Sequence, residues 1–67
     1  TMKFYIVAER VSLDGYAEQM TVGFDNRATD DFDNAMFFST KEQAEEWTTS
    51  KEAAEWKDCC FEVYSDN

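Results

Sequence analysis

The dipeptide Asp14-Gly15 lies between two runs of strand-forming residues, and it constrains the fold more than any other feature of this sequence. The first run, residues 3–11, reads KFYIVAERV, and the second, residues 16–24, reads YAEQMTVGF. Glycine adopts a positive φ at little cost, so an Asp-Gly pair between two such runs is a strong hairpin signal. The sequence therefore predicts a hairpin of two antiparallel strands near the N-terminus.

Three further segments complete the predicted order of elements. Residues 25–34, DNRATDDFDN, are polar, acidic and aperiodic, which is typical of a loop. The apolar run AMFFS at residues 35–39 predicts a third strand, and the alternating run CCFEVYS at residues 59–65 predicts a closing strand. Between them, Ser39 or Thr40 can cap a helix that reaches about residue 57. We therefore expect one α+β domain over residues 1–67, in the order β-β-β-α-β, with the helical segment on one face of a small antiparallel sheet.

The helical segment contains a near-repeat. TKEQAEEW at residues 40–47 returns as SKEAAEW at residues 50–56, and each copy starts with a residue that can cap a helix. The intervening residues 48–50 are Thr, Thr and Ser, whose hydroxyls compete for the backbone and weaken a helix. One kinked helix and two short helices both fit this pattern. A straight helix places Trp56 among carboxylates, whereas a break turns it inward toward the core.

Alternation along the strands predicts which side chains form the core. One face of the first run carries Phe4, Ile6 and Ala8, and the other carries Tyr5, Val7 and Val11. We expect the core to contain seven larger apolar residues, namely Phe4, Ile6, Val22, Phe37, Trp47, Phe61 and Val63. The opposite face, with Phe38 added, is apolar for a solvated surface, and such patches commonly mark interfaces. Homodimerisation, by face packing or by strand pairing at an edge, is therefore one hypothesis.

Charge limits the partners of the chain. Among 67 residues, 15 Asp and Glu oppose 6 Lys and Arg, which gives a net charge of −9. Such a surface repels nucleic acid and anionic membranes and favours proteins with basic surfaces. The six cations are scattered along the sequence, so we expect no direct nucleic-acid binding. An alternative interpretation is that the charge serves solubility alone.

The residues needed for common catalytic chemistry are missing. The sequence has no histidine and two glycines, so it lacks the usual general base and a glycine-rich phosphate loop. Cys59 and Cys60 are adjacent and build neither a disulfide framework nor a zinc pattern. We therefore predict a protein that is not an enzyme, has no cofactor or metal, and is soluble and cytoplasmic, since the sequence has no long apolar stretch or secretory signal. Thr1 before Met2 is interpreted as a remnant of expression.

Two groups of carboxylates are the candidate binding residues. The first lies on the helical segment, where carboxylates three or four residues apart are neighbours and could imitate the charge spacing of DNA. The second lies in the acidic loop and would extend the negative surface. With Trp56 as a hydrophobic anchor, the predicted partner-binding set is Glu42, Glu45, Glu46, Glu52, Asp30, Asp31 and Asp33. Calcium binding by residues 25–34 is a further alternative, although the spacing departs from that of an EF-hand.

The chain also has a resemblance in its general plan. The start MKFYIV and the strand-to-helix join AMFFSTKEQAEEW resemble segments of small acidic proteins encoded by bacteriophages and prophages, among them anti-CRISPR and other anti-defence proteins. The resemblance implies a stoichiometric inhibitor that occupies a basic surface of a CRISPR or other nucleic-acid-handling defence complex in a bacterial host. The resemblance implies only the class of protein, and it assigns no functional role to any residue of this sequence.

Overall fold

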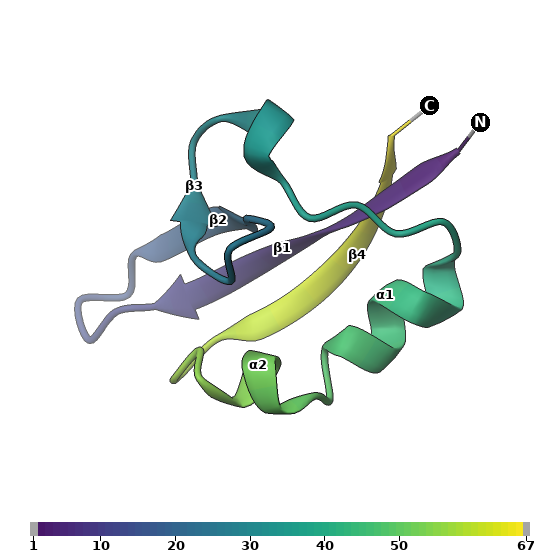
Figure 1. Cartoon of the computed structure of the whole chain (residues 1–67). Coiled ribbons are helices and arrows are strands. Elements are labelled where there is room, and N and C mark those ends of the chain that lie inside the picture. The colour runs from purple at the N-terminus through teal and green to yellow at the C-terminus, as the bar shows by residue number, and fades with distance from the viewer. Residues whose placement is uncertain (1, 67) are drawn as a thin grey trace.

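A computed structural model describes residues 2–66 as an antiparallel sheet of four strands with two short helices (Figure 1). Thr1, interpreted above as a remnant of expression, lies outside the described residues. The spatial order of the strands is β3-β2-β1-β4, so β1 is interior and β4 forms one edge. The predicted α+β class is therefore confirmed. The elements are β1 (Lys3–Val11), β2 (Ala17–Val22), β3 (Ala28–Thr29), η1 (Phe32–Asn34, a 3-10 turn), α1 (Lys41–Trp47), α2 (Lys51–Ala54) and β4 (Cys60–Asp66).

The predicted hairpin is present as β1 and β2. Their antiparallel register runs from Val7 opposite Thr21 to Val11 opposite Ala17. The backbone N–H of Ser12 donates to the carbonyl of Tyr16 at 2.8 Å, which leaves residues 13–15 as the connection. Gly15 has a φ of +87°, a conformation that residues with a side chain rarely adopt. Glycine therefore closes this turn because it adopts a positive φ at little cost, as the sequence predicts.

The third strand is not where the sequence places it. The strand β3 lies inside residues 25–34, for which the sequence predicts a loop. The run 35–39 instead forms two isolated bridges, Gly23 with Ala35 and Phe4 with Phe38. The run crosses from the end of β2 to the first half of β1 and meets each strand at one residue. This crossing prevents the repeated pairing that a regular strand needs.

The helical segment is broken in two, as the near-repeat allowed. Thr40 caps α1 by accepting from the N–H of Gln43 at 3.1 Å, and Ser50 caps α2 by accepting from the N–H of Ala53 at 3.3 Å. Between the helices, each hydroxyl of residues 48–50 donates to the carbonyl three residues before it, a competition that weakens helices. The break therefore follows from the three hydroxyl residues that separate the two copies.

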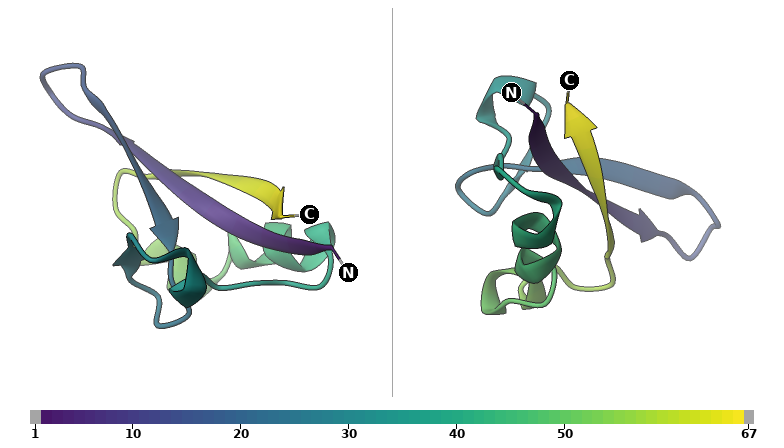
Figure 2. Two further views of the ribbon diagram at one scale, coloured as in Figure 1. Left: turned by 90° about the horizontal axis from the view of Figure 1, so that it is seen from above. Right: turned by 90° about the vertical axis from the view of Figure 1, so that its right-hand side faces the viewer.

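The core lies between the helices and one face of the sheet (Figure 2). Its fully buried members are small or branched, namely Ile6, Ala8, Val22 and Ala44. Because Ala8 and Ala44 carry only a methyl group, α1 can lie close to β1. Larger side chains pack around them half-buried, among them Phe4, Trp47, Phe61 and Val63. With the fully buried Ile6 and Val22, six of the seven predicted core residues lie in the core.

The assignment of Phe37 and Phe38 to faces was wrong. Phe38 bridges Phe4, and residues opposite each other in an antiparallel pair share a face, so Phe38 packs against the core. Phe37 points to the other face, where its ring lies 6.3 Å from that of Tyr5 and 5.2 Å from that of Phe32. This second face thus carries an aromatic cluster of its own, made of Tyr5, Phe32, Phe37 and Tyr64.

Removing one methyl group from the core tests this packing. Ile6 is fully buried, so Ile6→Val should lower the free energy of unfolding by about 1 kcal/mol. Val11→Thr changes a side chain that is 63% exposed and should alter it by less than about 0.5 kcal/mol. Urea denaturation followed by tryptophan fluorescence measures both variants. Equal stability losses would contradict the assignment of Ile6 to the core.

Candidate functional site

Two of the predicted binding carboxylates, Glu42 and Glu46, lie on the exposed surface of α1. The opposite side of this helix carries Ala44 and Trp47 and packs against the sheet. Residues four apart lie one turn from each other, with about 5–6 Å between their Cβ atoms. Glu42 and Glu46 therefore form a compact pair of negative charges that points away from the core.

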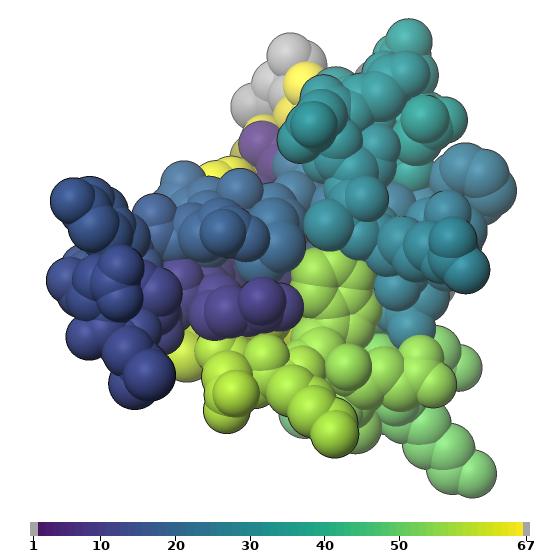
Figure 3. All heavy atoms as spheres, turned by 90° about the vertical axis from the view of Figure 1, so that its left-hand side faces the viewer, coloured from purple at the N-terminus to yellow at the C-terminus, as the bar shows by residue number. Residues whose placement is uncertain are grey.

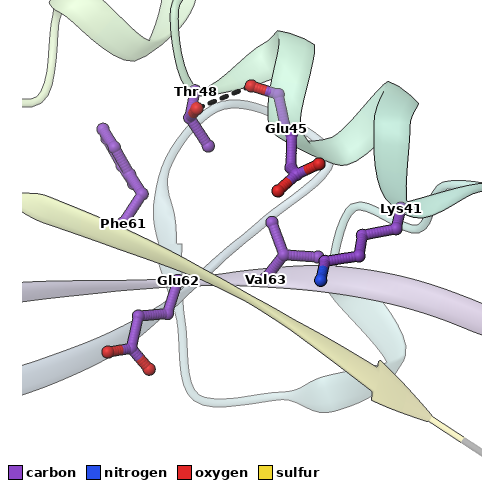
Figure 4. Close-up of a pocket in the computed structure, with 6 residues that line it drawn as sticks. All are labelled: Lys41, Glu45, Thr48, Phe61, Glu62 and Val63. Atoms are coloured by element: carbon purple, nitrogen blue, oxygen red, sulfur yellow. Dashed lines mark hydrogen bonds between the residues drawn. The ribbon is translucent and has the colours of Figure 1, made fainter.

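Glu45 lies on a different side of the same helix. With Lys41 and Thr48 it forms the helical wall of a groove between α1 and β4, and the strand contributes Phe61, Glu62 and Val63 (Figure 4). The groove has a volume of about 390 Å³. In Figure 4 the carboxylate of Glu45 and the ammonium of Lys41 both lie near Val63. Glu45 is thus a groove residue rather than a member of the outward pair.

Glu52 belongs to α2 and is exposed, but its helix is separate from α1. The backbone carbonyl of Glu52 accepts from Asn26 Nδ2 at 3.3 Å, and Glu55 Oε1 accepts from the same nitrogen at 2.7 Å. These bonds tie the turn after β2 to α2. The four helical glutamates therefore do not form one continuous array on a single helix.

The acidic loop does not extend the surface of the helices. Asp30, Asp31 and Asp33 are all exposed, and Asp31 caps η1 by accepting from the N–H of Asp33 at 3.0 Å. Phe32 in η1 packs edge-on against Tyr5 at 4.8 Å, on the face of the sheet opposite the core. The two groups of carboxylates therefore belong to segments that pack against opposite faces of the sheet, α1 against the core face and η1 against the face of Tyr5.

Trp56 is turned inward, and the break between the helices accounts for this. Its side chain is half-buried, packs against the core and lies edge-on to Phe61 at 6.2 Å. Its indole N–H donates to Asn26 Oδ1 at 3.0 Å. The role of an exposed anchor ringed by carboxylates is therefore not supported by its position, and its contacts are those of a structural residue.

The cations are less scattered in space than along the sequence. Arg10, Arg27 and Lys57, half of the Lys and Arg in the chain, line a second groove of about 450 Å³ beside Trp56. Glu55 also lines it. The protein therefore combines acidic surfaces with one locally basic groove, a juxtaposition that only the fold reveals.

Sequence reasoning also missed an apolar surface at the tip of the hairpin. Val11, Leu13 and Tyr16 are 63%, 107% and 75% exposed, and the tip stands out from the body of the molecule (Figure 3). The signal was a leucine inside the turn and a tyrosine directly after it, where polar residues are usual. Exposed tyrosine is common at the centres of protein interfaces.

The described residues show no metal centre and no membrane helix. Within residues 2–66, no three His, Cys, Asp or Glu side chains come together as ligands for a metal ion, and this includes the acidic segment considered for calcium. The same residues hold no helix with the length and apolar character that crossing a membrane requires. Comparisons with protein-family models, with curated proteins and with solved structures found no match.

One titration tests the geometry of β4. The Tyr64 hydroxyl donates to Glu62 Oε2 at 3.0 Å, and this bond, together with the carboxylate charge, raises the pKa of Tyr64 above its ordinary value of 10.0. Because the pKa is raised by folding, the stabilisation is present below pH 10 and is lost as the pH rises through the pKa of the folded state. Glu62→Gln should therefore lower the pKa of Tyr64 in an NMR titration. Glu18→Gln removes a carboxylate that makes no bond to Tyr64 and should leave that pKa unchanged.

Proposed function

We propose that this chain is a non-catalytic, acidic inhibitor or adaptor that binds a basic surface of another protein. The observation that carries the proposal is the exposed pair Glu42 and Glu46 on a chain of net charge −9. Charge of one sign concentrated on a surface speeds encounter with an opposite surface and disfavours wrong partners. The proposed partner is therefore a protein whose working surface is basic.

Nucleic-acid-handling proteins are the class of partner that fits this chemistry best. Their binding surfaces are rich in lysine and arginine because they neutralise phosphates. The resemblance to anti-CRISPR and other anti-defence proteins leads to the same class, with a bacterial host complex as the target. The separation of the acidic groups by the sheet favours local imitation of a few phosphates by α1 over broad imitation of a duplex. The two free thiols, Cys59 and Cys60, are compatible with action in a reducing cytoplasm.

Charge reversal on α1 tests this proposal. The tagged protein is used to capture partners from a bacterial lysate, and a salt step elutes what is bound through charge. The double substitution Glu42→Lys and Glu46→Lys should release the salt-eluted protein, with a loss of affinity of about 100-fold, since each charge contact contributes about 1.4 kcal/mol or more.

The acidic loop supplies a matched control. Asp30→Lys together with Asp33→Lys makes the same change in net charge, from −9 to −5, on the opposite face of the sheet. If α1 is the binding surface, this variant should retain the partner. Equal loss in both variants would show that net charge alone holds the partner, and a partner that resists the salt step would contradict an electrostatic mechanism.

Self-association is a second candidate function, and the exposed apolar tip of the hairpin favours it. Leu13 and Tyr16 could pack against a second copy, with the surface charge serving solubility alone. This candidate predicts a stable dimer at low micromolar concentration that Leu13→Ser dissociates. Light scattering measures the molar mass, and a monomer for the unsubstituted protein would exclude this candidate.

A further inference from the structure

The outer edge of β4 is open. This strand is the last in the sheet order, and only β1 pairs with it among the described strands. An edge strand of seven residues presents unpaired N–H and C=O groups, which are a template for another extended chain. Which of these groups point outward follows from the hydrogen bonds of β1.

The bonds of β1 alternate between its two neighbours. The N–H of Phe4 donates to the carbonyl of Phe38 at 3.0 Å, and the N–H of Phe38 donates back at 2.8 Å. Ser12, which follows β1 and is also even-numbered, bonds to Tyr16 on the same side. Because the backbone groups of successive residues in a strand point in opposite directions, the odd-numbered residues of β1 bond toward β4.

The register then assigns the groups of β4. Tyr5 and Val7 lie opposite Tyr64 and Glu62, so these two residues of β4 direct their backbone groups inward. The residues that alternate with them along the strand, Phe61, Val63 and Ser65, direct their N–H and C=O groups to the open edge. Among the described residues, no backbone group outside the sheet bonds to the N–H or C=O of these three residues. A strand added here can exchange two bonds at each of the three residues.

The groove between α1 and β4 lies directly beside this open edge. Phe61, Glu62 and Val63 form its strand side, and Lys41, Glu45 and Thr48 form its helical wall. In Figure 4 the side chain of Glu62 points away from α1. Side chains of an added strand alternate between the two faces of the sheet. Every second side chain would therefore enter the groove, where an apolar side chain can contact Phe61 and Val63, while the others would lie on the opposite face of β4, toward which the Glu62 side chain points in Figure 4.

Charge selects the occupant of this edge. Glu45 lies in the groove wall, Glu62 projects from the opposite face of β4 in Figure 4, and the whole chain carries a charge of −9. A second copy would bring another nine negative charges, whereas the basic side chains of a partner segment would find the opposite charge of Glu62 on the face away from the groove. Lys41 is the one cation that lines the groove.

We propose that the open edge of β4 binds an extended, basic segment of a partner protein as a fifth strand, with alternating apolar and basic side chains. The apolar side chains occupy the groove between α1 and β4, and the basic side chains lie beside Glu62. Main-chain bonds provide affinity in this mode, and the groove provides specificity. The inference rests on the proposed function only in that the partner is a basic protein, since the surface is distinct from the pair Glu42 and Glu46.

Amide hydrogen exchange on the whole protein tests the proposal residue by residue. The probe is a capped seven-residue peptide that alternates lysine and valine, titrated to about 1 mM. In the free protein, the amides of Phe61, Val63 and Ser65 should exchange quickly, whereas those of Glu62 and Tyr64 should be protected. On binding, the first three should become at least tenfold more protected. A matching peptide of glutamate and valine should not bind.

A proline substitution provides the matched variant. Ser65 is exposed and its N–H points outward, so Ser65→Pro removes one edge donor without breaking a bond to β1. It should weaken peptide binding about tenfold, while Ser65→Ala, which keeps the N–H, should bind like the unsubstituted protein. Unchanged protection of Glu62 and Tyr64 verifies the fold of each variant.

The outcomes separate this inference from the proposed function. Absence of binding at about 1 mM peptide, or equal binding by Ser65→Pro and Ser65→Ala, would overturn strand addition. Binding that changes the amides around Glu42 and Glu46 but leaves Phe61, Val63 and Ser65 fast would also overturn it, and would leave the acidic surface of α1 as the binding site. The response of the captured partner to charge reversal on α1 does not depend on any of these results.

Discussion

The close contact of α1 with the centre of the sheet organises the rest of this protein. Ala44 is fully buried against Ile6 and Ala8, and a larger residue at either alanine would force the helix away. This contact fixes the rotation of α1, and the rotation sends Glu42 and Glu46 outward and Glu45 toward β4. A chain of this length buries little surface, so the half-buried aromatic side chains around the alanines supply the remaining contacts.

The hairpin and the start of α1 could be predicted from the sequence because interactions between neighbouring residues determine them. Gly15 closes the hairpin and Thr40 caps α1, and both effects depend only on neighbouring residues. The third strand was misplaced because it depends on where β2 ends and on how the chain crosses to β1. The exchange of Phe37 and Phe38 has the same origin, since one bridge to Phe4 decides which of two adjacent side chains meets the core.

The candidate site was predictable in its residues but not in its arrangement. Charge and helical spacing identified the exposed glutamates, yet the sequence does not reveal that the sheet lies between them and the acidic loop. Likewise, Arg10, Arg27 and Lys57 are far apart in sequence and line one groove only in the folded chain. The open edge of β4 depends on the strand order, which no local pattern specifies. Surfaces built from segments that are distant in the sequence therefore cannot be predicted from local sequence patterns.

The pairing of β1 with β4 also affects how the chain acquires its structure. Lys3 lies opposite Asp66, so the interior strand takes its second neighbour from the other end of the sequence. During synthesis the hairpin of β1 and β2 can form early, but one side of β1 stays open until residue 66 has left the ribosome. Contacts of such large sequence separation slow folding. For that interval the nascent chain exposes, on its most apolar strand, the kind of edge that the finished protein keeps only on β4.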